Sequence, residues 1–156
     1  MAKLSAFAVI ADETGRILFC HRADSDLWNL PGGAVEPAES PWHAVVREVR
    51  EEVCLDVEVT RLAGVYFKPT HDEASFLFDC RVVGGIPGLT DETDRFDWFA
   101  PDAIPSPVAE RQKERVLDSL RHASKTVLAS QDVAWADRRT REAESVVVMD
   151  VAPGKP

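Results

Sequence analysis

The chain has 156 residues, 45% of them hydrophobic and 29% charged, with a formal net charge of −9 at pH 7. This is the size and composition of one globular domain with its own core. The negative charge argues against nonspecific binding to DNA or anionic membranes. No apolar run approaches the roughly 20 residues that span a bilayer, and no secretory signal is visible. Cys20, Cys54 and Cys80 form no metal-ligand pattern, so we expect reduced thiols in a cytoplasmic protein.

The first third of the chain alternates strand and turn signals. Residues 3–11 and 16–22 are rich in strand-favouring side chains, and the turn signal of residues 12–15 between them predicts a hairpin. A polar loop at residues 24–26 follows. The next apolar residues lead into Pro31-Gly32-Gly33, where two glycines permit backbone geometry that other residues resist.

A helix is predicted from about Pro41 to Val53. Ser40 is suited to the N-cap and Pro41 to the first helical position. At the helical period one face is apolar: Val45, Val46, Val49 and Val53. The opposite face carries Arg47, Glu48, Glu51 and Glu52. Crowded acids repel one another, and carboxylate oxygens are the ligands that Mg²⁺ prefers, although a solvated acidic face is the ordinary alternative.

The remainder is predicted as mixed strands with one more amphipathic helix and a second candidate helix near the C-terminus. The expected strands are residues 56–68, 74–83, 95–100 and 145–151; the expected helices are 108–123 and 132–144; the expected loops are 69–73 and 86–94. By themselves, without comparison with a known family, these elements indicate only a mixed α and β protein. We expect a domain over residues 1–125 and a C-terminal extension over 126–156 that packs on the domain or on a partner subunit.

The stretch from Gly33 to Leu55 resembles the Nudix box, G-x5-E-x7-R-E-U-x-E-E-x-G-U, where U is a bulky aliphatic residue. The matching positions are Gly33, Glu39, Arg47, Glu48, Val49, Glu51, Glu52 and Leu55. Cys54 stands where the family has glycine. Glycine there would end the helix with positive φ, so Cys54 is expected in that strained conformation.

The resemblance implies an α+β fold, the Nudix-like α/β/α sandwich with a mixed β-sheet. It also implies a Mg²⁺-dependent hydrolase, with Mn²⁺ as an alternative ion. The residues it assigns to the metal are Glu48, Glu51, Glu52 and the backbone carbonyl of Gly32, with Glu51 and Glu52 also candidates for acting on water. Gly33, Glu39 and Arg47 would support the site, the arginine by pairing with box glutamates; a simple surface ion pair is the alternative.

Glu92 is predicted as a catalytic base or extra ligand, because it lies in an acidic loop six residues before Trp98, where some Nudix members carry a catalytic glutamate. Asp91 and Asp94 compete for this role, and a solvated loop acid is the alternative. The candidates for substrate contact are Arg22, Trp28, Tyr66, Phe67, Lys68 and His71. Core packing is the better interpretation for Trp28 and Phe67, and simple exposure for His71.

These features predict cleavage of the pyrophosphate bond in a nucleoside diphosphate linked to another moiety. ADP-ribose is one such substrate, because Pro69 falls near a proline of ADP-ribose-type members; nucleoside triphosphates and dinucleoside polyphosphates stay open. A nucleotide-binding or regulatory module with little turnover is the alternative, which the intact acids disfavour. A prenyl diphosphate isomerase is disfavoured by the complete hydrolase box. We expect no nucleic-acid or membrane partner and leave a homodimer open.

Overall fold

The computed structural model describes residues 1–131 and 146–150. Its strands are β1 (Lys3–Ile10), β2 (Ile17–Arg22), β3 (Leu27–Asn29), β4 (Gly32–Ala34), β5 (Leu55–Lys68), β6 (Glu73–Gly85), β7 (Thr93–Phe99), β8 (Lys125–Ser130) and β9 (Val146–Asp150). Its helices are α1 (Pro41–Val53), the short 3₁₀ helix η1 (Pro69–His71) and α2 (Glu110–Arg121). This is the mixed α+β architecture expected from the sequence.

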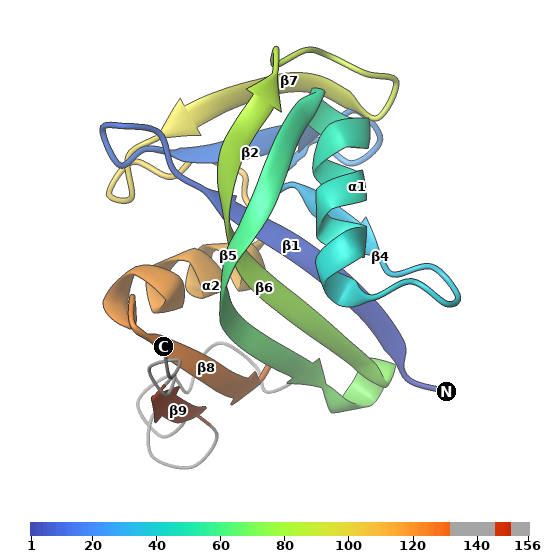
Figure 1. Ribbon diagram of the computed structural model, residues 1–156, viewed down its shortest axis with the longest axis vertical. Coiled ribbons are helices and arrows are strands. Elements are labelled where there is room, and N and C mark those ends of the chain that lie inside the picture. Colours follow the sequence, from blue (N-terminus) through green and yellow to red (C-terminus); the bar gives the residue numbers. More distant parts are fainter. Residues whose placement is uncertain (132–145, 151–156) are drawn as a thin grey trace.

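Two sheets organise the strands. The larger has six strands in the order β4-β1-β6-β5-β8-β9, and the smaller has three in the order β3-β2-β7. Within the larger sheet β1 runs parallel to β6 and β5 parallel to β8, while the other neighbours are antiparallel. The large sheet is therefore mixed, as predicted. The smaller sheet lies near the C-terminal end of α1, at the top of Figure 1.

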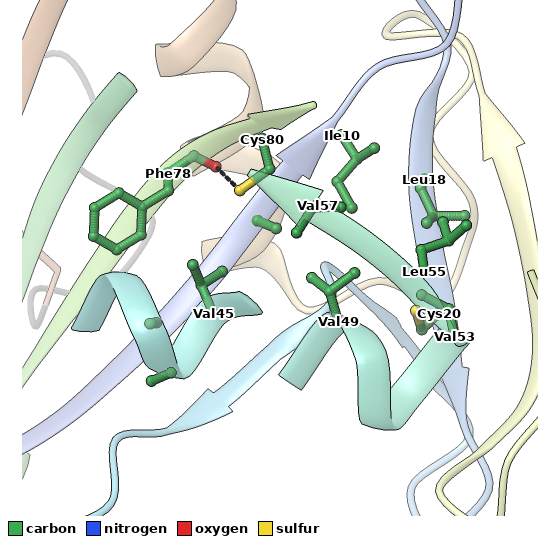
Figure 2. Packing of buried hydrophobic residues seen from close by; sticks show 13 residues of the cluster. Ile10, Leu18, Cys20, Val45, Val49, Val53, Leu55, Val57, Phe78 and Cys80 are labelled. Carbon is green, nitrogen blue, oxygen red and sulfur yellow. Dashed lines mark hydrogen bonds between the residues drawn. The ribbon is translucent and has the colours of Figure 1, made fainter. Parts of the chain in front are cut away.

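Apolar side chains on both faces of β1 place the sheet between the two helices. Ala6, Ala8 and Ile10 pack in a cluster with the valines of α1, whereas Val9 packs with Val116 of α2 in a second cluster. Successive side chains of a strand point to opposite faces, so this alternation requires a layer on each side. Figure 2 shows Val45 and Val49 of α1 directed toward the first cluster. The sandwich expected from the sequence is confirmed.

Helix α1 has the ends that its sequence predicts. The Ser40 hydroxyl accepts a hydrogen bond from the His43 N–H at 3.2 Å, and Pro41 is the first helical residue. At the other end Cys54 has φ of 62° and ψ of 21°, and its N–H donates to the Arg50 carbonyl at 3.0 Å. The left-handed conformation expected of residue 54 is therefore present with a cysteine side chain.

The predicted hairpin between the first two strands is wrong. The turn does form, since the Asp12 N–H bonds the Arg16 carbonyl and Ala11 bridges Ile17. Beyond this bridge the strands separate into different sheets, β1 between β4 and β6, and β2 between β3 and β7. Both strands are apolar on both faces, and β1 pairs with β6 and β2 with β7, which are far away in the chain; a local turn signal cannot reveal such pairing.

The C-terminal region continues the large sheet. Strand β8 pairs with β5 from Gly64↔Val127 to Phe67↔Ser130, and β9 pairs with β8, where the sequence predicted a strand. The domain boundary at residue 125 stays a prediction, and the helix expected over residues 132–144 lies outside the described residues. Among the described helices, none has the length and apolar character needed to cross a membrane.

Candidate active site

A pocket of about 670 Å³ opens where α1, β4 and the loop before β7 meet. Seven of its lining residues are acidic: Asp24, Glu36, Glu48, Glu51, Glu52, Asp91 and Glu92. Two are arginines, Arg22 and Arg47. Such an excess of acid repels a phosphate ligand unless cations enter with it. The pocket therefore favours cation binding before anion binding.

Three carboxylates converge in this pocket. Glu48 and Glu52 come from α1, and Glu92 comes from the loop before β7. One oxygen from each lies within 4.8 Å of the others. The helical spacing of four residues places Glu48 and Glu52 on one face, one turn apart. The structure thus brings Glu92 to the box glutamates, as the sequence predicted; Asp91 lines the pocket but is not in this group.

The two glycines of β4 permit close approach of different neighbours, Gly33 of the Glu48 side chain and Gly32 of β1. A Cβ at Gly33 would lie 2.7 Å from the carboxylate of Glu48, and a Cβ at Gly32 would lie 2.2 Å from the Ala6 carbonyl oxygen. Real Cβ atoms do not approach this closely, so any side chain at either position would displace its neighbour. The Gly32 N–H also donates to Glu52 Oε2 at 3.2 Å. Gly33 thus leaves room for the Glu48 carboxylate, and Gly32 for the backbone of β1.

Arg47 joins the helix to the preceding loop. Its guanidinium donates two hydrogen bonds to Glu39, at 2.8 and 2.9 Å, and one to the Ala34 carbonyl at 3.0 Å. The same group donates to Glu48 at 2.9 Å and to Glu51 at 3.1 Å. A forked arginine that meets several acceptors fixes geometry better than a single surface ion pair. Arg47 thus joins Glu39 to the box glutamates, and the supporting role that the resemblance implies for both residues stays a prediction.

The loop that carries Glu92 is tied to the end of α1. The Gly88 N–H donates to the Val53 carbonyl at 3.0 Å, and the Thr90 hydroxyl donates to the Glu52 carbonyl at 3.3 Å. The Glu92 N–H then donates to the Thr90 hydroxyl at 3.3 Å. The last carbonyls of a helix have no partner within it, so the loop satisfies them and is positioned by them. This explains how a distant carboxylate reaches the helical ones.

The acids in and beside the pocket differ in pKa, because some are buried and others are paired with Arg47. Burial, with the charges of Glu48 and Glu92 adding to it, raises the pKa of Glu52 to about 8, against the Gly32 hydrogen bond that lowers it. Burial likewise raises the pKa of Glu48, partly opposed by Arg47. The hydrogen bonds from Arg47 instead lower the pKa of Glu39 to about 2. The hydrogen bonds from Arg47 thus stabilise the ionised form of Glu39, whereas no arginine or lysine among the described residues donates a hydrogen bond to Glu52.

The other predicted site residues divide between the pocket and the core. Arg22 and Glu51 line the pocket, Arg22 paired with Asp24 at 2.9 Å and Glu51 half exposed beside Arg47. Trp28, Tyr66 and Lys68 are not among the described residues that line it.

These three residues pack elsewhere. Trp28 packs edge-on against Phe99, Tyr66 is fully buried with its hydroxyl donating to Asp118, and Lys68 pairs with Glu73 at 3.3 Å. The expectation that Phe67 packs in the core is wrong. Phe67 is 40% exposed, because the strand alternation turns Tyr66 inward instead.

Two functional candidates have no clear sequence signal. His21 is buried between Asp94 of β7, at 2.6 Å from its Nδ1, and Asp26 of the turn between β2 and β3, at 2.9 Å from its Nε2, and so links that turn to β7. Gln112 of α2 lines the pocket at 6% exposure. Gln112 shares the inward face of α2 with Val116, one turn later. A glutamine on this buried face is the only feature of the sequence that marks it as a candidate.

The donor set of the pocket fits a hard divalent cation. Carboxylate oxygens from three side chains, two on one turn of helix and one on a loop, lie close together, and Gly33 leaves space beside Glu48. Glu48, Glu52 and Glu92 are the side chains that would hold such an ion, with the Gly32 backbone beside them. No described cysteine joins this group, so a soft-metal site is not indicated.

Comparisons with known proteins identify the family of the chain. The family model described as NUDIX domain matches residues 1–120. A MutT-like protein of Streptomyces ambofaciens is 38% identical over 117 residues, which are 75% of this chain and 76% of that protein. A Bacillus subtilis protein, provisionally named an 8-oxo-dGTP diphosphatase, is 34% identical over 115 residues, 72% of this chain and 76% of that protein.

A solved structure is also similar. The crystal structure of an ADP-ribose pyrophosphatase from Streptococcus suis superposes with a TM-score of 0.67 and 31% identity, covering 78% of this chain and 93% of that one. Residues 1–120, which the family model matches, contain the box helix α1, the glycines of β4 and the loop of Glu92. The chain therefore belongs to the Nudix family and is a Nudix hydrolase.

Proposed function

We propose that this hydrolase cleaves the pyrophosphate bond of a nucleoside diphosphate linked to another moiety, and that it requires Mg²⁺ or Mn²⁺. The observation that carries the proposal is the convergence of Glu48, Glu52 and Glu92 within 4.8 Å in an acid-lined pocket. Such a group is costly for the folded chain unless a cation occupies it. Glu51 and the Gly32 carbonyl are the further ligands that we assign to this centre.

Each residue then has a task in hydrolysis. A divalent ion bound here would offset the charge of the diphosphate and make a water molecule more acidic. The water oxygen attacks one phosphorus, the bridging P–O bond breaks, and the two products leave as phosphorylated fragments. Glu92 accepts the proton of the water, because it lies on the loop side of the cluster and is exposed to solvent. Glu52 and Glu51 are the alternative acceptors.

The arginines of the pocket act differently from each other. Arg47 is committed to Glu39, Glu48 and the Ala34 carbonyl, and so positions the helix. The side chain of Arg22 is 58% exposed. Within the described residues, its one ion pair is with the exposed Asp24. A substrate phosphate could take the place of Asp24 at low cost, since such surface pairs are weak. We assign phosphate binding to Arg22 on this basis.

Relatives narrow the substrate to nucleotides without choosing one. The Streptococcus suis protein carries the name of an ADP-ribose pyrophosphatase, and the Bacillus subtilis protein that of an 8-oxo-dGTP diphosphatase. ADP-ribose is the first substrate to test, and nucleoside triphosphates the second. Pro69 begins η1 and is exposed. Among the described residues, Pro69 does not line the pocket. The ADP-ribose proposal therefore rests on the Streptococcus suis protein alone.

The test is direct. The protein is incubated with ADP-ribose, the four nucleoside triphosphates, 8-oxo-dGTP and a dinucleoside polyphosphate, each with Mg²⁺, Mn²⁺ or EDTA, and the products are resolved by chromatography. We expect turnover of at least one compound that depends on the added ion. Turnover that persists unchanged in EDTA would contradict metal dependence. Nucleotide binding without turnover of any compound would favour the regulatory module.

Two wider expectations accompany this proposal. A reducing, cytoplasmic compartment is supported by Cys20, Cys54 and Cys80, all of which are free thiols. Small-molecule nucleotides rather than nucleic acids or membranes are supported by the net charge of −9. Size-exclusion chromatography with light scattering would test the homodimer that the sequence leaves open.

A further inference from the structure

Gln112 has a buried polar atom that the protein leaves without a partner. The residue lies on the first turn of α2, where its N–H bonds the Ala109 carbonyl at 2.9 Å, and it is 6% exposed. Its side-chain Oε1 has no hydrogen-bond partner within the described chain, and it is the one described buried side-chain oxygen or nitrogen in this condition. A buried acceptor without a partner costs free energy, so an arrangement of this kind suits a ligand that supplies the donor.

The pocket that holds the acids also holds Gln112. The lining that includes Glu48 and Glu92 includes Gln112 together with Phe7 and Asn29. One continuous cavity therefore offers carboxylates from α1 on one wall and an uncharged amide from α2 on another. A ligand with a charged and an uncharged part matches this division, and a nucleotide is such a ligand.

Neighbouring contacts hold the α2 wall in place. Arg115, one turn after Gln112, donates to Gln131 Oε1 at 2.8 and 3.1 Å. Its guanidinium lies 5.4 Å from the centre of the Phe7 ring and 5.1 Å from that of Tyr66. Arg115 is 1% exposed, so these contacts are internal. These contacts join α2 to the Phe7 ring, so the two elements that carry Gln112 and Phe7 are held together before a ligand binds.

We propose that Gln112 recognises the nucleobase of the substrate. An amide offers one donor group and one acceptor side by side, and it pairs with a base edge that presents an acceptor next to a donor. An aromatic ring in the same wall suits the apolar face of the base. The substrate class is therefore a compound with an intact nucleobase rather than any diphosphate ester. This inference rests on the proposed function, since it assigns the base to one wall and the diphosphate to the acids.

The test measures binding, so that it does not depend on turnover. Titration calorimetry with Mg²⁺ compares AMP, GMP, CMP and UMP with ribose 5-phosphate, which lacks the base. The proteins are the wild type, Gln112→Met, which keeps the length of the side chain without its hydrogen bonds, and the matched control Lys113→Met on the same helix. Lys113 is not among the pocket-lining residues of the described chain. Gln112→Ala replaces the methionine variant if that variant does not fold.

For the wild type and Lys113→Met we expect at least one nucleotide to bind more tightly than ribose 5-phosphate. In Gln112→Met this advantage should fall by about 10- to 100-fold, with ribose 5-phosphate binding unchanged. The melting temperature should stay equal or rise, because an unpaired buried polar atom is removed. An unchanged preference for nucleotides would overturn the proposal, and so would a wild type that binds all five compounds equally.

The two proposals fail in different ways. If the panel of diphosphates gives no hydrolysis while Gln112→Met still loses nucleotide preference, the proposed reaction is wrong and base recognition stands. If ADP-ribose or a triphosphate is hydrolysed while the preference is unaffected, the reaction stands and Gln112 is a structural residue whose oxygen meets a buried water.

Discussion

Glu52→Gln should remove activity and, in the absence of metal, stabilise the fold at alkaline pH. Burial raises the Glu52 pKa from the usual 4.5 to about 8. The folded protein then holds a proton that the unfolded chain releases once the pH passes about 4.5. The free energy of unfolding must therefore fall as the pH rises from 4.5 to 8, since the folded state binds more protons over that range.

The size of the effect follows from the pKa. Each pKa unit corresponds to about 1.4 kcal/mol, so ionisation of Glu52 in the folded protein costs on the order of 3 to 5 kcal/mol. Glutamine has the same shape and still accepts the Gly32 N–H, but carries no charge. At pH 8 in EDTA the variant should be more stable than the wild type by up to this amount. At pH 4.5 the two should be nearly equal, and added Mg²⁺ should stabilise the wild type more.

Chemical unfolding at pH 4.5 and pH 8, each with EDTA and with Mg²⁺, measures these differences, and steady-state turnover at pH 8 is measured beside it. Turnover should fall by about 100-fold or more, because the lost ligand or base costs several kcal/mol of barrier. Glu51→Gln is the matched control for stability, since Glu51 is half exposed beside Arg47. Equal stability of Glu52→Gln and wild type at pH 8 in EDTA would refute the reasoning about buried charge. Turnover at the wild-type rate with the same metal dependence would refute the assignment of Glu52 to the site.

Four further substitutions test the site and the end of its helix. Glu92→Gln should lower turnover by about 10- to 1000-fold with less effect on substrate affinity, and Asp91→Asn much less; wild-type turnover of the Glu92 variant at saturating Mg²⁺ would move the base to the box helix. Cys54→Gly should raise stability by roughly 1 kcal/mol in thermal melts, because φ is 62°; a lower melting temperature would show that the cysteine packs usefully. Gly33→Ala should weaken Mg²⁺ binding and turnover together in calorimetry and kinetics, because its Cβ would lie 2.7 Å from the Glu48 carboxylate; unchanged Mg²⁺ affinity would show that the helix shifts without cost.

The local part of the fold could be predicted from the sequence, because local signals determine it. The Ser40 cap, Pro41 and the valine face predict α1 with the ends that the structure shows. The partners of β1 and β2 could not be predicted, since strand pairing joins residues far apart in the chain. The turn between them is present, but it says nothing about which sheet each strand enters.

The candidate site divides in the same way. Glu48 and Glu52 are neighbours on a helix, so their spacing in the sequence places them together. The approach of Glu92 depends on hydrogen bonds from its loop to the last carbonyls of α1, which only the fold reveals. The candidate role of Gln112 could not be predicted from the sequence for another reason. A glutamine on a helix is ordinary, and only its burial without a partner marks it out.

The hydrogen bonds of Arg47 indicate where the proposed cation would bind. A guanidinium has five N–H donors, and Arg47 directs two of its bonds to Glu39 and one to the Ala34 carbonyl. These bonds lower the Glu39 pKa to about 2, whereas Glu52 receives only a backbone N–H. An arginine placed between Glu52 and Glu92 would have stabilised the folded chain, but it would also have occupied the space for the metal. Under the proposed function, the cost of ionising the buried Glu52 is stability that the chain forgoes, and an external cation arriving with the substrate phosphates would offset that cost.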